Sequence, residues 1–186
     1  RSSAASDVYK RQVMEGKGVL FKRFAGIDVF DIEIAQNDPD KFIEAVASLE
    51  PTFGGINLED IKAPECFKIE RELRERMNIP VFHDDQHGTS IIVGAALINA
   101  LKLIDKKIED IKVVCSGAGA AAISCLDLIC ALGVQKSNIT VSDSRGIIST
   151  KRENLDESKQ RYARDTEATS INEVMDGVDM FLGLSM

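Results

Sequence analysis

A glycine-rich turn between two apolar runs constrains the fold of this chain more than any other feature. Residues 111–116 form an apolar run typical of a buried strand, residues 117–119 are Gly-Ala-Gly, and residues 120–132 have the length and composition of a helix. A second apolar run, residues 139–143, ends in an aspartate about 20 residues after the glycines. Strand, tight turn, helix and strand in this order predict the β-α-β unit of a Rossmann fold.

The turn also matches the dinucleotide fingerprint G-x-G-x-x-A, whose helix start receives a pyrophosphate. Asp143 would accept the ribose hydroxyls and favours NAD, because a carboxylate repels the 2′-phosphate of NADP. Arg145, two residues further on, leaves NADP open. The alternative interpretation is an alanine-rich turn that only packs a helix against a sheet.

Two pairs of neighbouring acids, Glu59-Asp60 and Asp84-Asp85, each follow a strand-like run. Both pairs would lie at the same edge of a parallel sheet, where a hard divalent cation such as Mg²⁺ or Mn²⁺ could neutralise them. A solvated turn or a helix cap is the alternative for either pair alone. We interpret the flanking His83 and His87 as structural or supporting residues rather than zinc ligands.

The rest of the chain alternates helices and strands, which predicts the α/β class. We expect strands at residues 27–34, 52–58, 79–82 and 180–184. Helices are expected within residues 16–24, from Pro39, from Pro64, from a cap at Thr89 and around residues 171–175. The charge-rich residues 103–110 predict a domain boundary, although the long helix before them could pack on either side.

Composition excludes several classes of protein. A net charge of −7 with 5% aromatic residues argues against nucleic acid as a partner. No run approaches the roughly 18 uninterrupted apolar residues of a membrane span, and no secretory leader is recognisable, so we expect a cytoplasmic protein. The four cysteines lack zinc-site spacing and are expected to be reduced thiols, most of them buried.

Both ends of the chain look cut. Residues 1–12 are small and polar, resemble a cloning adaptor and are expected to be non-native. The last six residues lie within a predicted buried strand and the turn after it, where a natural domain rarely ends. We therefore expect a fragment of a longer polypeptide.

Six segments taken in order resemble malic enzyme, the bacterial decarboxylating malate dehydrogenase, from about Val13 to the end. These segments are VMEGKGVLFK, EPTFGGINLEDI, PVFHDDQHGT, CSGAGAAA, ITVSDSRG and DMFLGLS. The resemblance implies part of an N-terminal α/β malic-enzyme domain at residues 13–103. It also implies part of a Rossmann NAD(P)-binding domain with a parallel sheet at residues 104–186.

The resemblance further implies oxidative decarboxylation of malate to pyruvate with reduction of NAD or NADP. It assigns Mg²⁺ or Mn²⁺ to Glu59, Asp60 and Asp85, proton transfer to Lys17, and a supporting role to Asp84. The dinucleotide contacts that it implies fall on Thr89, Gly117, Ala118, Gly119, Ala120, Ala121 and Asp143. Relatives are usually dimers or larger, so a homo-oligomer is expected for the full-length protein.

The sequence departs from the family because several of the family's functional residues fall outside it. The family's catalytic tyrosine and substrate-binding arginine lie upstream of residue 13, and its pocket asparagines lie beyond residue 186. Neither Tyr9 nor Tyr162 is expected to replace that tyrosine, so we expect the fragment itself to be inactive. The alternatives are a decarboxylating dehydrogenase of another 2-hydroxy acid and a non-catalytic dinucleotide-binding module.

Overall fold

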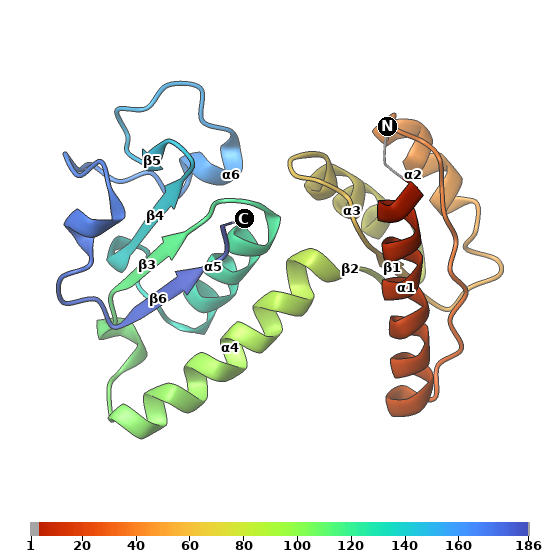
Figure 1. The fold of residues 1–186 in the computed structure, drawn as a ribbon, viewed down its shortest axis with the longest axis horizontal. Helices are drawn as coiled ribbons and strands as arrows, with labels where there is room; N and C mark the ends of the chain where they lie inside the picture. The colour runs from red at the N-terminus through yellow and green to blue at the C-terminus, as the bar shows by residue number, and fades with distance from the viewer. Residues whose placement is uncertain (1–3, 186) are drawn as a thin grey trace. The chain divides into compact units, whose positions relative to one another are not determined.

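The computed structural model describes residues 4–185, which form two compact parts divided between Asp38 and Pro39 (Figure 1). In the first, α1 (Ala4–Ala25) includes the short helix expected at residues 16–24 and also runs through most of the segment expected to be non-native. Gly26, with φ +69°, ends α1, and its N–H bonds to the carbonyl of Lys22 at 3.1 Å.

The strand predicted at residues 27–34 is wrong, because residues 26–38 have no regular structure. A strand needs a neighbour for its backbone N–H and C=O groups. Within this part the segment instead returns along α1, to which ion pairs attach it. Arg11 Nε lies 2.8 Å from Glu33, and Lys22 Nζ lies 2.7 Å from Asp28.

The second part opens with two helices and a two-stranded parallel sheet. The elements are α2 (Pro39–Ala47), β1 (Ile56–Leu58), α3 (Glu65–Arg76) and β2 (Val81–His83). Pro39 begins α2 as expected, since proline suits the first helical position. Both strands are shorter than their apolar runs. β1 and β2 pair in parallel with Leu58 opposite His83, so the residues after both strands emerge at one edge.

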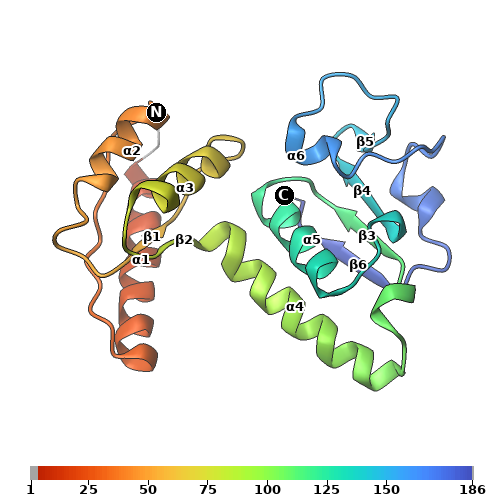
Figure 2. The same ribbon diagram turned by 180° about the vertical axis from the view of Figure 1, so that it is seen from behind.

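Helix α4 (Asp84–Ile104) packs along α5 (Ala120–Leu132), as Figures 1 and 2 show. Gly94 permits this contact, because a Cβ there would lie 3.0 Å from the side chain of Leu128. α4 is apolar on all sides, and by length and composition alone it could cross a membrane. The core helices of soluble proteins meet the same criterion, so this property does not identify a membrane span.

A four-stranded sheet forms the centre of the second part, in the order β5-β4-β3-β6. β3 (Val113–Ser116) pairs in parallel with β4 (Ile139–Asp143) and β6 (Met180–Gly183), whereas β5 (Gly146–Ile147) is antiparallel to β4. α5 covers one face, where its residues Ile123, Leu126 and Ile129 are buried in the core. The predicted Rossmann β-α-β unit is confirmed, and α5 and β4 have the predicted bounds.

Short elements complete the chain. These are η1 (Ile108–Asp110), η2 (Lys136–Asn138), α6 (Glu157–Gln160) and η3 (Ile171–Val174), the last being a 3₁₀ turn where a helix was expected. All four cysteines are free, and three are buried as predicted. Burial raises the pKa of the Cys115 thiol to about 12, so this cysteine packs as an inert apolar residue.

Candidate active site

The fingerprint turn lies at the carboxyl end of β3. Gly117 has φ +115°, and its N–H donates to the carbonyl of Ser142 at 2.8 Å. A Cβ at Gly117 would lie 2.6 Å from the backbone carbonyl of Leu184. Only glycine fits there, because both the conformation and the space exclude a side chain.

Gly119 has a different environment, although it belongs to the same fingerprint. It is the N-cap of α5, with φ −84°, and a Cβ built on it would find no atom within 4 Å. Ala120 and Ala121 follow in the first turn, where backbone N–H groups have no partner within the helix. Open space before a helix start is what the close approach of a pyrophosphate requires, so these residues fit a dinucleotide.

Asp143 lies at the carboxyl end of β4, as expected for a ribose ligand, but its carboxylate is already engaged. Arg152 binds both oxygens, at 3.0 and 2.9 Å, and Lys159 Nζ lies 3.3 Å away. The N–H of Arg145 donates to it at 2.9 Å. Burial alone would raise the pKa of Asp143, but these hydrogen bonds and charges outweigh it and hold the pKa at about 2.

The expectation that Asp143 favours NAD assumed a free carboxylate. Arg152 and Lys159 both face the carboxylate of Asp143, and Lys159 also lies 3.9 Å from Asp156, so two cations and two acids meet at this strand end. These partners were not predictable from spacing, because they lie 9 and 16 residues later and reach Asp143 through tertiary packing.

The two acid pairs lie at the same edge of the β1-β2 sheet. Glu59 and Asp60 follow β1 directly, and Asp84 and Asp85 form the first turn of α4 directly after β2. The N–H of Asp60, a residue with φ +58°, donates to Oδ2 of Asp85 at 3.0 Å. The predicted convergence of the pairs is present, and their role as metal ligands stays a prediction.

The carboxylates of the two acid pairs are the kind of ligand that a hard cation binds, but they are not arranged around a common point. Within the described residues, no group of three or more His, Cys, Asp or Glu side chains is arranged to hold a metal ion. Oδ1 of the neighbouring Asn57 in β1 is buried and has no hydrogen-bond partner there. Carboxylate and amide oxygens are the ligands that Mg²⁺ and Mn²⁺ prefer, so the donor chemistry of these residues fits such an ion.

Asp84 lies against its own helix. A Cβ at Gly88, four residues later, would lie 2.3 Å from Oδ1 of Asp84, so glycine leaves room for this carboxylate. Helix α4 begins five residues before Thr89, so the prediction that Thr89 caps the helix is wrong. The cap position belongs to His83, because the helix starts directly at the end of β2.

His83 is fully buried, and neither ring nitrogen makes a hydrogen bond within the described residues. Burial lowers its pKa, which keeps the ring neutral. Nε2 of His87 lies 2.7 Å from Oε1 of Glu70, a buried carboxylate of α3. Sequence reasoning missed Glu70, although it lies four residues after Cys66 and one after Ile69 on the buried face of α3.

Lys17 and Tyr162 belong to other elements of the chain. Lys17 lies in α1, in the first compact part, and its relation to the acids stays a prediction. Tyr162 follows α6 and is buried, and its hydroxyl donates to Oδ1 of Asp127 in α5 at 2.5 Å. This bond gives Tyr162 a structural role.

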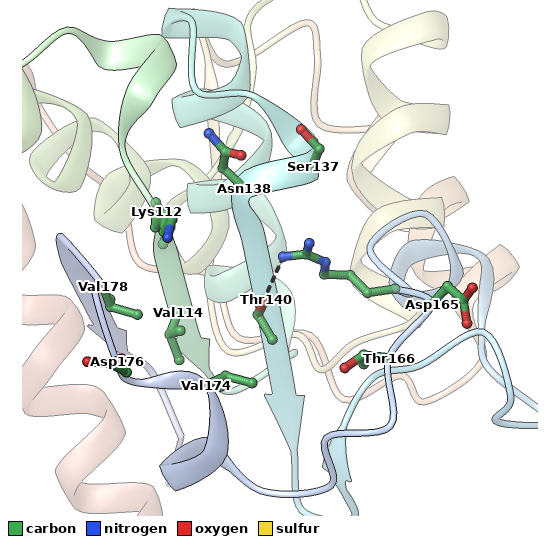
Figure 3. A pocket seen from close by; sticks show the side chains of 12 residues that line it. Lys112, Val114, Ser137, Asn138, Thr140, Asp165, Thr166, Val174, Asp176 and Val178 are labelled. Carbon is green, nitrogen blue, oxygen red and sulfur yellow. Dashed lines mark hydrogen bonds between the residues drawn. The ribbon is translucent and has the colours of Figure 1, made fainter.

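A cavity of about 320 Å³ lies beside β3 and β4 (Figure 3). Arg164 borders it and donates to Oγ1 of Thr140 at 3.0 Å, the bond drawn dashed in the figure. Lys112, Asp165 and Asp176 also line the cavity, so its charges of both signs balance. None of the predicted site residues lies in it.

An α/β fold with a glycine-rich strand-to-helix turn and an acid at the next strand end defines a dinucleotide-binding protein. Residues 7–74 match the family model "Malic enzyme, N-terminal domain", and residues 86–181 match "Malic enzyme, NAD binding domain". The chain therefore belongs to the malic enzyme family. The position of the boundary between its domains stays a prediction; α4 packs on the Rossmann side, which is one of the two arrangements expected.

Relatives and solved structures agree with this assignment. The chain is 65% identical to the NADP-dependent malic enzyme of Salmonella typhimurium, over 94% of the chain and 23% of that protein. It is 57% identical to an NAD-dependent malic enzyme of Rhizobium meliloti, over the same shares. The crystal structure of the NAD-dependent malic enzyme of Thermotoga maritima matches 94% of the chain and 47% of its own, with 46% identity and a TM-score of 0.86. The chain thus spans about a quarter of the length of these curated relatives.

Proposed function

We propose that the protein to which this sequence belongs oxidises malate and decarboxylates it to pyruvate and CO₂, with reduction of NAD(P)⁺. The observation that carries the proposal is the hydrogen bond between Asp60 and Asp85, which joins the two acid pairs in a dinucleotide-binding chain. The interpretation as helix caps accounts for these acids less well. No side chain caps α4, and the helix after Glu59-Asp60 begins only at Glu65.

Each residue has a defined part in this proposal. Glu59, Asp60 and Asp85 would hold Mg²⁺ or Mn²⁺, which when bound polarises the C2 oxygen of malate as a Lewis acid. Lys17 would accept the proton of the C2 hydroxyl, with Asp84 as its acidic partner. The start of α5 binds the pyrophosphate and so presents the nicotinamide to C2, which loses a hydride.

Replacing Asp85 by alanine tests the metal part of this proposal. We expect the affinity of the chain for Mn²⁺, measured by isothermal titration with and without NADP⁺, to fall by at least about 10-fold. Asp110→Ala is the matched control, because this exposed acid lies in η1, outside both pairs. Equal Mn²⁺ affinity in wild type and Asp85→Ala would rule out the proposed ligand set.

The two cations beside Asp143, Arg152 and Lys159, support NADP as the preferred cofactor. We expect NADP⁺ to bind about 10-fold more tightly than NAD⁺, since Arg152 and Lys159 would face the 2′-phosphate. Lys159→Gln should weaken the binding of NADP⁺ and leave the affinity for NAD⁺ unchanged, as measured by fluorescence titration. Lys151→Gln, which removes a lysine from an exposed pair with Glu167, serves as the control. An equal loss of affinity for NADP⁺ and NAD⁺ in Lys159→Gln would contradict a role of Lys159 in cofactor preference.

A further inference from the structure

A part-buried hydrogen bond connects α3 to the helix that carries the second acid pair. Glu70 is 6% exposed and lies on the face of α3 that buries Cys66, Ile69 and Leu73. Its Oε1 lies 2.7 Å from Nε2 of His87. A buried carboxylate without a partner is very costly, so this contact is needed wherever Glu70 is ionised.

The contact meets α4 where that helix has little other support. His83, the N-cap residue, makes no side-chain capping bond, although it is fully buried at the end of β2. Gln86 is buried as well, with its Nε2 unpaired among the described residues. The side chains of residues 83, 86 and 87 thus anchor the helix start from inside the protein, while Asp85 remains exposed at the edge of the sheet.

The direction of this first turn decides where Asp85 points. Oδ2 of Asp85 accepts a hydrogen bond from the N–H of Asp60 at 3.0 Å. The two residues follow β2 and β1, which are only three residues long each. Because both strands are short, contacts made by the first turn of α4 itself help to set its position relative to β1. The hydrogen bond of His87, two residues after Asp85, fastens this turn to α3.

We propose that Glu70 is a positioning residue, which acts through His87 to hold Asp85 against Asp60 at the sheet edge where the proposed divalent cation would bind. This inference rests on the proposed function, because it concerns the same acids. Glu70 itself does not touch the cation or the substrate. Partners that orient a ligand in this way commonly change metal affinity by 10- to 100-fold when removed.

The first test needs no metal. In the amide NMR spectrum of the 186-residue chain, Glu70→Ala should shift the Asp60 N–H resonance upfield, because its bond to Asp85 is lost. Glu70→Gln should keep the wild-type position, since its amide oxygen can still accept from His87. Glu72→Ala on the same helix, which removes a partly exposed partner of Lys68 and Arg76, should also leave it unchanged.

The second test adds Mn²⁺ and follows paramagnetic broadening of the amides of residues 59–60 and 84–85. Glu70→Ala should need about 10-fold more Mn²⁺ for the same broadening, whereas Glu70→Gln and Glu72→Ala should match wild type. If Glu70→Ala does not fold, His87→Asn must show the same weakening, because this partly exposed side chain can be shortened without a buried cavity.

The outcomes separate the two proposals. A folded Glu70→Ala variant with wild-type Asp60 resonance and wild-type Mn²⁺ broadening overturns the positioning role and leaves the metal site intact. If Mn²⁺ causes no localised broadening in the wild-type chain, the metal site is refuted, and the positioning role is refuted with it. A shifted Asp60 resonance with unchanged Mn²⁺ affinity shows a structural tether only and also refutes the inference.

Discussion

Replacing Gly117 by alanine is expected to unfold the Rossmann part of the chain, whereas the same change at Gly119 should leave it folded. At Gly117 the added Cβ would lie 2.6 Å from the backbone of Leu184, in a conformation with φ +115° that side chains rarely adopt. Strain and overpacking together should cost about 3 kcal/mol or more of the free energy of unfolding, measured by urea titration and circular dichroism.

Gly119→Ala is the matched control, because the space around its Cβ is open. We expect its free energy of unfolding to stay within about 1 kcal/mol of wild type. NADP⁺ affinity should nevertheless fall by about 10-fold, since the methyl group would occupy the approach of the pyrophosphate. A Gly119→Ala variant that binds NADP⁺ as wild type does would show that the turn only packs a helix on a sheet.

The contrast between these glycines shows how far the sequence determines the fold. The bounds of α5 and β4 were predictable, because each is an apolar run of the appropriate length and the runs are bracketed by glycine and aspartate. Residues 27–34 have the same local signal as a strand but form none, because pairing is not a local property. Thr89 resembled a cap, yet the backbone of β2 passes directly into α4.

The candidate site was predictable to a similar degree. The convergence of Glu59-Asp60 with Asp84-Asp85 follows from parallel strands, whose carboxyl ends meet at one edge. The partners of these acids were not predictable, because Glu70 and Arg152 reach their contacts through tertiary packing. Both partners are buried or half-buried charges, and their energies depend on geometry that no spacing rule contains.

The contribution of Asp143 to the free energy of unfolding is also large, and it depends on pH. The folded-state pKa of Asp143 is about 2, below the ordinary value of about 3.9, so its stabilisation is fully present above pH 4. The stabilisation is lost as the pH falls from about 4 through about 2, and it amounts to about 2 kcal/mol.

Asp143→Asn should therefore lower the free energy of unfolding by about 2 kcal/mol at pH 7, because Arg152 and Lys159 lose their partner in a half-buried position. Urea titrations between pH 7 and pH 3 should give a shallower pH dependence for this variant than for wild type, with the two curves converging at low pH. Asp165→Asn, which removes an exposed acid, should follow the wild-type curve. Parallel curves for Asp143→Asn and wild type would mean that the three charges are solvated and neutralise one another weakly. In that case, the cations would be free to bind a 2′-phosphate without first leaving Asp143, and the cofactor preference would no longer depend on this acid.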